Sequence, residues 1–429
     1  GPASGVIAAA YTGRRASRPN LISYDMGGTS TDVALIRDCQ PSVSNEIEIE
    51  YAMPIHVPMV DVRTIGAGGG SIARVNEAGL LEVGPQSAGA DPGPICYGRG
   101  GDLPTISDAN MVLGRLDVGK LKSVPGAVDI DDIRGIFQTR LGDPLGVDAE
   151  TAAAAVLRMA TTRMAGATRM VSVSLGLDPR DFSLFAFGGA GPLHASALAG
   201  ELGVPEVLVP ARPGITNALG CIVADLRHDF VRTVNTPLDG MEIDRLAGMM
   251  AAQAGEGEAL IRQEPVRIEA IEVTHSLDMQ FVGQTHLLSV PLASAMMTRA
   301  DIQNAFEEVY FNRFRVRLPD IRAQIVNVNT SVTGRRPEVD LGGLIDNSAR
   351  AGSVVAAQTG SRPEWFDADG PAAGWQDPHV YARETLPLDA RLNGPAILEQ
   401  MDTTILIEPQ DSAVSDDDGN ILVTVGGLS

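Results

Sequence analysis

A short glycine turn between two apolar segments constrains the fold of this chain more than any other feature. Residues 20–25 and 33–36 have the apolar pattern of β-strands, and residues 26–32 between them read Met-Gly-Gly-Thr-Ser-Thr-Asp. Two strands joined so closely form a hairpin, whose tip exposes backbone N–H groups. A polyphosphate needs several such donors at close range, and glycines permit this approach because no Cβ stands in the way. The turn therefore favours a phosphate-binding site.

The residues around this turn add to the phosphate hypothesis. Hydroxyls at Thr29, Ser30 and Thr31 can donate to the same oxygens. Asp25, just before the turn, is placed to hold Mg²⁺ through water or to orient an attacking group. In the alternative interpretation, the glycines only supply positive φ angles, and Thr and Ser only favour a turn. The flanking acids and the three successive hydroxyls favour the phosphate site.

A second glycine turn, Gly188-Gly189-Ala190-Gly191, follows an apolar strand pattern and precedes an expected helix. The N-terminus of that helix offers partial positive charge, and the glycines let a flat ligand lie against the backbone. Many α/β proteins use such a turn only for close packing of a strand and a helix, so the signal is weak by itself. The spacing lacks the GxGxxG pattern of dinucleotide-binding folds, and the chain has no P-loop motif.

Two further residues next to glycine-rich segments fit structural roles better than chemical ones. His194 follows the second turn and could contact a nucleotide, but a packed core histidine is the stronger interpretation. Cys96 could be reactive, yet an isolated cysteine is more often a small buried residue. The six histidines show no spacing typical of metal ligands.

The charge balance bears on the kind of partner. The chain has 33 basic and 54 acidic side chains, a net charge of −21, whereas nucleic acids and anionic membranes need a basic surface. No apolar run approaches the length of a membrane span. Three scattered cysteines make neither a disulfide framework nor a CxxC metal site. We therefore expect a cytoplasmic protein with no nucleic-acid or membrane partner.

We expect three regions: residues 1–235 and 236–345, in which helix and strand patterns alternate, and residues 346–429, an irregular segment with a small β-rich C-terminal region. Expected helices cover residues 147–174, 241–263 and 298–315, and a further helix runs from after His194 to about Leu202. Expected strands include parts of 45–65 and residues 181–187, 207–210, 268–275 and 277–281. Residues 79–104 are expected to form a long Gly/Pro-rich loop, 348–380 an irregular segment, and 390–427 a small all-β tail.

Several motifs, taken in order, resemble the hydantoinase A / 5-oxoprolinase family, within the sugar kinase–Hsp70–actin superfamily. The segment 25–33 resembles the second phosphate motif of that family. Further matching stretches are 64–72, 84–101, 108–116, 185–195 and 394–399. The resemblance implies an α/β fold, with an actin-like (ribonuclease H-like) lobe and an appended, mainly β C-terminal region.

The resemblance also implies the ligands and the residues that hold them. The expected ligands are ATP and Mg²⁺. The β- and γ-phosphates would be held by Gly27, Gly28, Thr29, Ser30 and Thr31, with Asp25 as the catalytic residue near Mg²⁺. Adenosine would pack against Gly188, Gly189, Ala190 and Gly191.

The implied activity is phosphorylation of a carbonyl oxygen in a small cyclic amide or imide, such as a hydantoin or 5-oxoproline. A B-type subunit would then hydrolyse the activated ring. The equivalent ATP-using subunit of an acetone- or acetophenone-type carboxylase remains an alternative, as does a lobe that only binds and assembles.

Family members carry a first phosphate motif in an N-terminal lobe, and this chain, which starts at Gly1 without Met, shows only the second motif. We therefore expect the C-terminal portion of an A-type subunit, with half of the nucleotide cleft contributed by the missing lobe. Alone, such a portion is expected to be inactive.

Overall fold

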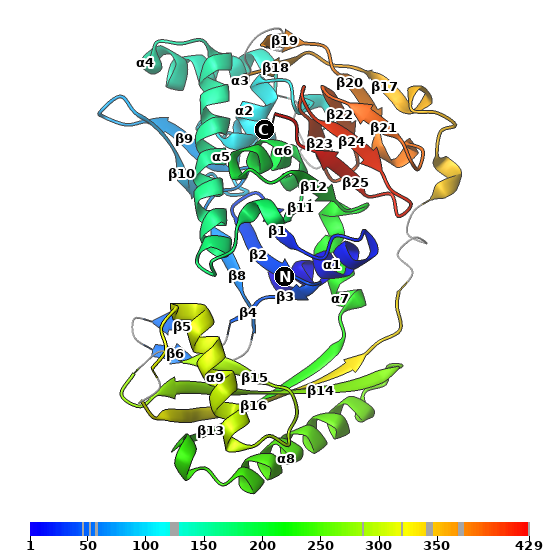
Figure 1. Cartoon of the computed structure of the whole chain (residues 1–429). Coiled ribbons are helices and arrows are strands. Elements are labelled where there is room, and N and C mark those ends of the chain that lie inside the picture. Colours follow the sequence, from blue (N-terminus) through cyan, green and yellow to red (C-terminus); the bar gives the residue numbers. More distant parts are fainter. Residues whose placement is uncertain are drawn as a thin grey trace. The chain divides into compact units, whose positions relative to one another are not determined.

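The computed structural model describes residues 1–44, 47–50, 53–55, 59–120, 128–284, 287–318, 321–339, 346–367 and 373–427 (Figure 1). The chain forms two compact units. Unit 1 comprises residues 1–43, 60–222 and 340–429, and unit 2 comprises residues 44–59 and 223–339. Both ends of the sequence therefore belong to the same unit.

Unit 1 is built on a sheet in which the described strands follow the order β21-β24-β25-β12-β11-β1-β2-β3, with β8 also paired to β2. Their bounds are β1 Leu21–Met26, β2 Thr31–Arg37, β3 Gln40–Pro41, β8 Val62–Ile65, β11 Ser183–Phe187, β12 Glu206–Val209, β21 Arg391–Asn393, β24 Ser412–Ser415 and β25 Ile421–Thr424. β1, β11 and β12 are parallel, whereas β2 is antiparallel to β1 and β25 is antiparallel to β12. The hairpin predicted from the sequence is confirmed by the pairing of β1 with β2.

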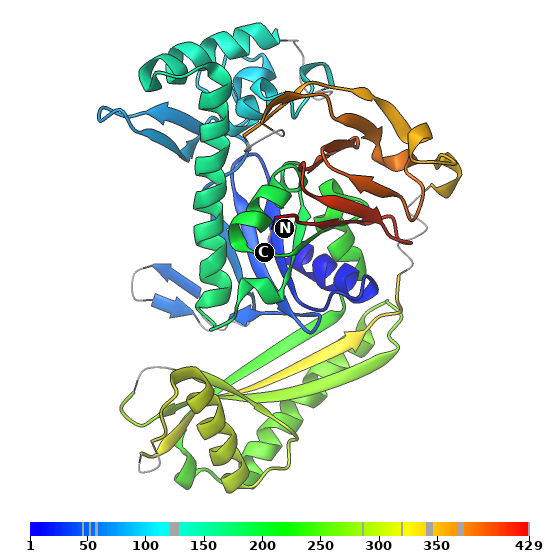
Figure 2. The same cartoon turned by 45° about the horizontal axis from the view of Figure 1, so that its top comes forward.

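Helices cover both faces of this sheet. The helices up to residue 223 are α1 Pro2–Arg15, α2 Ile106–Val112, α3 Ile130–Phe137, α4 Asp143–Leu145, α5 Ala149–Val173, α6 Gly191–Leu202 and α7 Thr216–Val223. Side chains alternate between faces along a strand, so Leu21 and Phe185 pack with α1, while Ile22 and Leu184 join the large core with α5 and α6. Figures 1 and 2 show α1 and α5 on opposite sides of β1 and β2. The central strands are apolar at successive positions because both of their faces are buried.

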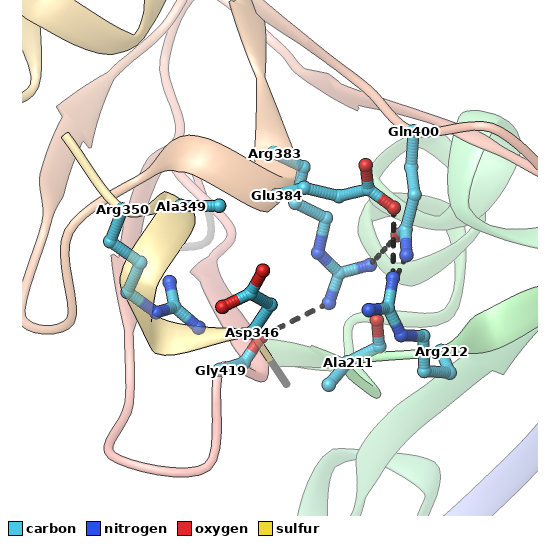
Figure 3. A pocket seen from close by; sticks show the side chains of 9 residues that line it. All are labelled: Ala211, Arg212, Asp346, Ala349, Arg350, Arg383, Glu384, Gln400 and Gly419. Carbon is cyan, nitrogen blue, oxygen red and sulfur yellow. Dashed lines mark hydrogen bonds and ion pairs between the residues drawn. The ribbon is translucent and has the colours of Figure 1, made fainter. Parts of the chain in front are cut away.

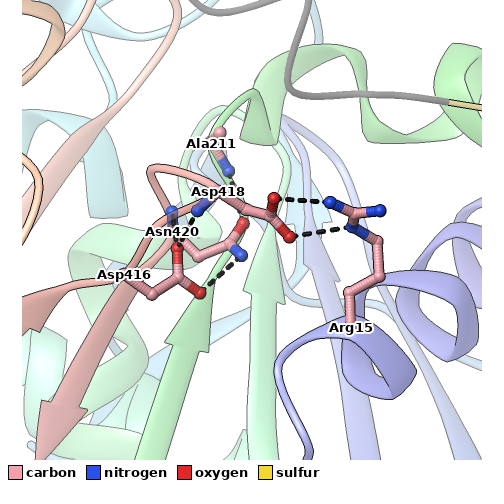
Figure 4. A network of polar contacts seen from close by, with 5 residues as sticks. All are labelled: Arg15, Ala211, Asp416, Asp418 and Asn420. Atoms are coloured by element: carbon pink, nitrogen blue, oxygen red, sulfur yellow. Dashed lines mark hydrogen bonds and ion pairs between the residues drawn. The ribbon is translucent and has the colours of Figure 1, made fainter.

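The C-terminal strands extend this sheet, and the turn that joins two of them, β24 and β25, is held by side-chain contacts to other segments. Arg15, in the last turn of α1, donates from Nε and Nη2 to the carboxylate of Asp418 at 2.8 and 2.7 Å (Figure 4). Asn420 donates to Asp416 at 2.8 Å and accepts from the backbone N–H of Ala211 at 3.1 Å. The turn between β24 and β25 is thereby fixed to α1 and to the end of β12.

Two segments differ from the expectations based on sequence. Residues 79–104 are not one loop, because β9 (Ser71–Val75) pairs with β10 (Leu81–Ser87). Gly84 and Pro85 interrupt the strand pattern of β10, and the register shifts there.

Residues 348–380 are likewise not irregular throughout, since they contain strands. These strands are too short for an alternation of apolar and polar residues to be recognised in the sequence. The strands of this part and its partners are β17 Gln358–Ser361, β18 Glu364–Phe366, β19 Gly374–Gln376, β20 His379–Ala382, β22 Ala396–Glu399 and β23 Thr404–Ile407. They form a sheet in the order β17-β20-β22-β23 and a β18-β19 pair.

Unit 2 contains an antiparallel sheet in the order β13-β16-β14-β15. Its elements are β13 Leu226–Pro237, α8 Ile243–Gln263, β14 Ala270–Phe281, β15 Leu288–Leu292, α9 Arg299–Phe314 and β16 Ala323–Arg335. Both predicted helices are confirmed. The two strands predicted at 268–275 and 277–281 are one strand, β14, because Ser276 continues the pairing with β16.

The predicted strands in 45–65 are confirmed where the chain is described, and the remainder of that segment lies outside the described residues. The described strands there, besides β8, are β5 Ile47–Glu50, β6 Met53–Ile55 and β7 Met59–Val60, and β4 Val43–Ser44 lies just before the segment. Across the described ranges of both units, none of the helices is long and apolar enough to span a membrane.

Candidate functional site

Both glycine turns lie at one edge of the main sheet of unit 1. β1, β11 and β12 run in the same direction, so the turns that follow them meet at their carboxyl ends. The backbone N–H of Ala190 donates to the carbonyl of Met26 at 3.1 Å, and that of Gly188 donates to Pro213 at 3.0 Å. The structure therefore brings the two predicted turns together and adds a third, residues 210–215.

The first turn presents two backbone donors outward. The glycine-rich loop 66–71 holds it from one side, because the N–H groups of Gly69 and Gly70 donate to the carbonyls of Gly27 and Gly28 at 3.0 and 2.6 Å. In a trans peptide the C=O and N–H groups point in opposite directions, so the N–H groups of Gly28 and Thr29 point away from that loop. Among the described residues, none accepts a hydrogen bond from either N–H group. Both are thus available to an anion.

The fold itself gives no reason for glycine at these positions. Neither Gly27 nor Gly28 has a positive φ angle. A Cβ at Gly28 would find no atom within 4 Å, and one at Gly27 would lie 3.7 Å from the Ser30 carbonyl oxygen. The alternative interpretation, in which these glycines supply positive φ, is therefore wrong. A ligand lying against the backbone would account for the missing Cβ.

The three hydroxyls of this segment have different surroundings. Thr29 is exposed and Ser30 is half-buried. Thr31 is fully buried, and its hydroxyl donates to the carbonyl of Ala67 at 2.6 Å. Thr29 and Ser30 thus lie at the turn, whereas Thr31 fastens the hairpin to the loop behind it.

That loop depends on its own glycines. A Cβ at Gly68 would lie 2.7 Å from the backbone nitrogen of Ser30, and one at Gly70 would lie 3.0 Å from the carbonyl oxygen of Gly28. Contacts this short between a Cβ and the backbone require a shift of the chain. Glycines in 66–71 therefore let the loop pack directly on the back of the first turn.

Asp25 lies beside the first turn and is held by a side chain that the sequence analysis missed. Its Oδ2 accepts from Nδ2 of Asn217, in α7, at 2.8 Å. Asp32 is directly opposite Asp25 in the hairpin and accepts from the hydroxyl of Thr64 at 2.6 Å. Burial raises the pKa of Asp25, the hydrogen bond from Asn217 lowers it, and repulsion from Asp32 raises it again. The net shift is upward.

The second turn differs from the first because the fold requires its glycines. Gly188 has φ +80°, and a Cβ there would overlap Oδ1 of Asp25 and lie 2.7 Å from the carbonyl oxygen of Met26. Gly191 begins α6, and its Cβ would lie 3.3 Å from the carbonyl oxygen of Tyr24. This turn packs closely against β1, which brings the start of α6 next to Asp25.

Two residues from other segments complete this edge. Thr403 donates from its hydroxyl to the carbonyl of Gly189 at 3.2 Å, and the Asp402 carboxylate accepts from the N–H of Gly214 at 3.0 Å. The sequence does carry a signal for Asn217, because this residue comes just after the turn 210–215, which follows the parallel strand β12. No pattern in the sequence pointed to Asp402.

The interpretation of His194 as a packed core residue is confirmed. Its side chain is 1% exposed and its Nε2 lies 3.2 Å from Nδ2 of Asn110. Burial, together with the nearby Arg115 cation, lowers its pKa to about 3, so the ring is neutral at physiological pH. Cys96 is also buried, and burial raises the pKa of its thiol, which makes it unreactive. Across the part of the chain that the structure describes, no three His, Cys, Asp or Glu side chains gather as a metal site.

Comparison with known families decides where this chain belongs. The sequence model described as Hydantoinase/oxoprolinase matches residues 1–230, and the model of the Hydantoinase/oxoprolinase C-terminal domain matches residues 256–422. The chain belongs to the hydantoinase/oxoprolinase family. The family expected from the motifs is confirmed.

Named relatives of this family member include a caprolactamase subunit and a 5-oxoprolinase. It is 33% identical to the caprolactamase subunit alpha of Pseudomonas jessenii, over 95% of this chain and 59% of that protein. It is 31% identical to the 5-oxoprolinase PfmaA of Pestalotiopsis fici, over 96% of this chain and 32% of that protein. The chain thus spans only part of the length of each relative.

Solved structures agree with the sequence comparison. The ATP-dependent caprolactamase from Pseudomonas jessenii matches with a TM-score of 0.84 and 32% identity, over 99% of this chain and 62% of that one. The nucleotide-free acetone carboxylase matches with a TM-score of 0.75 and 26% identity, over 99% and 61% of the two chains. The mixed α/β fold is therefore shared with both enzymes.

Proposed function

We propose that this chain holds the phosphates of ATP at the turn 27–30, as part of a protein that phosphorylates the carbonyl oxygen of a small cyclic amide or imide. One observation carries the proposal: the first turn presents two outward N–H donors, those of Gly28 and Thr29, next to glycines for which the fold itself has no need. Phosphate groups bind to such arrays of backbone donors because several charge-assisted hydrogen bonds form at once.

The residues of the site divide the work by their chemistry. The N–H groups of Gly28 and Thr29, with the hydroxyls of Thr29 and Ser30, would hold the β- and γ-phosphate oxygens. Asp25 would hold Mg²⁺ through water, oriented by Asn217. This donor set fits a hydrated magnesium ion, since Mg²⁺ usually keeps several waters and uses one or two carboxylates.

The remaining parts of the proposed site follow the resemblance of the sequence. Adenosine would lie along Gly188, Gly189, Ala190 and Gly191, and Thr31 would serve the phosphate site through its bond to Ala67. The arrangement of strands supports a sugar kinase–Hsp70–actin-like lobe within residues 1–235. In that arrangement β2 is antiparallel to both β1 and β8, whereas β11 and β12 are parallel to β1.

The proposed chemistry explains why ATP would be needed. The carbon of a lactam is a poor electrophile because the nitrogen lone pair is delocalised into the carbonyl. ATP would supply the phosphoryl group that turns the carbonyl oxygen into a leaving phosphate. The chain's part is to fix and neutralise the transferring group, which is the main requirement of phosphoryl transfer.

We further propose that a B-type subunit and a preceding lobe complete the enzyme, which would act in the cytoplasm. Two relatives bear subunit names, caprolactamase subunit alpha and acetone carboxylase beta subunit, and the chain spans 59% and 58% of their lengths. The portion described here would then have little or no ATP hydrolysis by itself.

A second candidate is the ATP-using subunit of an acetone- or acetophenone-type carboxylase, which the structural match to acetone carboxylase favours. The experiment measures ADP release by the complete protein with its partner, given cyclic amides or a ketone with bicarbonate. Release with a cyclic amide supports the first function, and release only with ketone and bicarbonate replaces it by the second.

The same assay tests the site through Gly28→Ala, with Gly166→Ala as the matched control, because a Cβ at either position has open space around it. We expect Gly28→Ala to lose at least about tenfold in affinity for ATP, which corresponds to about 1.4 kcal/mol. Unchanged ATP affinity in Gly28→Ala would remove the phosphate role of the turn.

A further inference from the structure

Three arginines surround one cavity in unit 1 (Figure 3). Arg212 follows β12, Arg350 follows a short helical turn at 347–349, and Arg383 follows β20. The cavity has a volume of about 170 Å³. Its other lining residues are Ala211, Asp346, Ala349, Glu384, Gln400 and Gly419. Among the described residues that line it, none is proposed to hold ATP, although Ala211 and Arg212 belong to the third turn, residues 210–215, at the same sheet edge.

Arg383 is buried, and its hydrogen-bond partners among the described residues are all neutral groups. Only 4% of the residue is exposed, and its guanidinium donates to the carbonyls of Val209, Pro210 and Gly419 and to Oε1 of Gln400. Within the described part of the chain, no carboxylate lies at ion-pair distance from it. Burial lowers the pKa of this guanidinium to about 9. The carboxylates of Asp402 and Asp416 raise this pKa, and the cations of Arg212 and Arg350 lower it. The hydrogen-bond partners of the guanidinium are all neutral, so an anion in the cavity would offset part of the cost of its burial.

Arg350 repeats this situation at the other side of the cavity. Its Nε donates to the side chain of Asn347 at 2.9 Å, and its Nη1 donates to the carbonyl of Leu386. In the described ranges it likewise has no ion pair. Burial lowers the pKa of Arg350, and the nearby positive charge of Arg212 lowers it further.

Two carboxylates also line the cavity and limit its charge. Glu384 pairs with Arg212 at 2.9 Å. Asp346 is exposed, accepts from the backbone N–H of Ser348 at 2.9 Å, and lies between Arg350 and Arg383 in Figure 3. Among the residues that line the cavity, three arginines thus face two carboxylates, in a chain of net charge −21. Asp402 and Asp416, which do not line the cavity, act on Arg383 from outside it.

We propose that the pocket formed by Arg212, Arg350 and Arg383 binds a phosphate group. The three guanidiniums come from three separate segments, and a tetrahedral phosphate offers oxygens in several directions, whereas a planar carboxylate offers a single pair. The phosphate is either inorganic phosphate or the terminal group of a larger molecule. This proposal shares no residue with the glycine turns and does not depend on the proposed function.

Calorimetric titration of the chain with inorganic phosphate tests the proposal. Arg350→Gln is the test variant, because Arg383 also holds three backbone carbonyls and its loss would disturb the fold. We expect Arg350→Gln to weaken phosphate binding at least tenfold. Arg391→Gln, at an exposed position of β21 in the same unit, should bind as the unaltered chain does.

A second variant, which should change phosphate binding in the opposite direction, makes the test sharper. Asp346→Asn removes a carboxylate but keeps the oxygen that accepts from Ser348, so phosphate binding should tighten about threefold, which a purely structural role would not produce. Phosphate binding that also occurs in Gly28→Ala would separate this pocket from the glycine turn.

Titration with ATP distinguishes the sources of the phosphate. Binding of ATP that depends on Arg350 assigns the pocket to a nucleotide phosphate, and binding of phosphate alone assigns it to the free ion. The proposal is overturned if neither inorganic phosphate nor ATP binds, if Arg350→Gln binds both unchanged, or if only a dicarboxylate such as glutarate binds.

Discussion

The two glycine turns of unit 1 look alike in sequence, yet glycine occupies them for different physical reasons. At Gly188 the backbone has a positive φ angle, and a side chain would overlap Asp25 and the backbone of β1. At Gly28 the φ angle is not positive, and a side chain would meet nothing within 4 Å. Glycine at 188 is explained by the fold, and glycine at 28 is not. The comparison teaches that the unexplained glycine, not the crowded one, marks the face where a ligand approaches the backbone.

The largest expected difference between the two turns is the loss of stability in Gly188→Ala. The left-handed backbone and the overlap with Asp25 should lower the free energy of unfolding by about 2–4 kcal/mol. Gly28→Ala should change it by less than about 0.5 kcal/mol, as an exposed substitution without a clash. Denaturant unfolding of both variants measures the difference. Equal stability losses would show that the two turns do not differ as described.

The loss of stability in Gly68→Ala should lie between the losses in Gly188→Ala and Gly28→Ala. Its Cβ would press on the backbone nitrogen of Ser30, so the loop 66–71 must move and the first turn with it. We expect a loss of about 1–3 kcal/mol in stability and weaker binding of ATP.

Gly66→Ala is the matched control in the same loop, because its Cβ would make only an ordinary contact of 3.5 Å with Pro85. Unfolding curves and ATP titrations of the two variants test this. If Gly68→Ala binds ATP as tightly as Gly66→Ala, the loop does not shape the turn.

Much of this arrangement could be predicted from the sequence because it lies in long, strongly patterned elements. The hairpin of β1 and β2, the helix α5 and the strand–turn–helix unit of β11 and α6 each show a clear period. The strands β10 and β18 were missed, since the first is interrupted by Gly84 and Pro85 and the second is three residues long. The pairing of β25 with β12 joins segments far apart in the sequence, which no local pattern reveals.

The candidate site was predictable to a similar degree. The sequence identified both turns, since glycines and hydroxyls next to a strand are visible locally. It did not show that Gly69 and Gly70 turn the N–H groups of the first turn outward, because that depends on hydrogen bonds between separate loops. Asn217 and Asp402 reach this edge only through the tertiary fold.

A smaller effect is expected from Asn217, which supports Asp25 through a hydrogen bond. Asn217→Ala removes the hydrogen bond to Oδ2, so the carboxylate loses its fixed orientation. Loss of such a supporting group typically costs about 10–100-fold in metal affinity or activity, and we expect the lower end because Asp25 would hold Mg²⁺ through water. The Mg²⁺ concentration for half-maximal ATP turnover should rise. Asn76→Ala, in the β9–β10 hairpin, is the control, and an equal rise in both variants would contradict the assigned role.

The smallest effect concerns pH. The pKa of Asp25 is raised in the folded chain, mainly by burial, so the folded state binds this proton more tightly than the unfolded state does. The contribution of Asp25 to stability is therefore fully present below its unfolded pKa and is lost as the pH rises through the higher folded pKa. Asp25→Asn cannot show this loss, so the free energy of unfolding of the unaltered chain, measured relative to that of Asp25→Asn in denaturant at each pH, should fall as the pH rises through the folded pKa of Asp25. A difference that instead grows in favour of the unaltered chain with rising pH would show a lowered pKa.

The central claim is that the backbone N–H groups of Gly28 and Thr29 receive the phosphates of ATP. The most direct measurement follows the amide NMR signals of these two residues while the chain is titrated with ATP and Mg²⁺. New hydrogen bonds to phosphate should move both amide protons downfield, in step with binding and more than the amide of Gly166. Saturable binding of ATP with the signals of Gly28 and Thr29 unmoved would contradict the account.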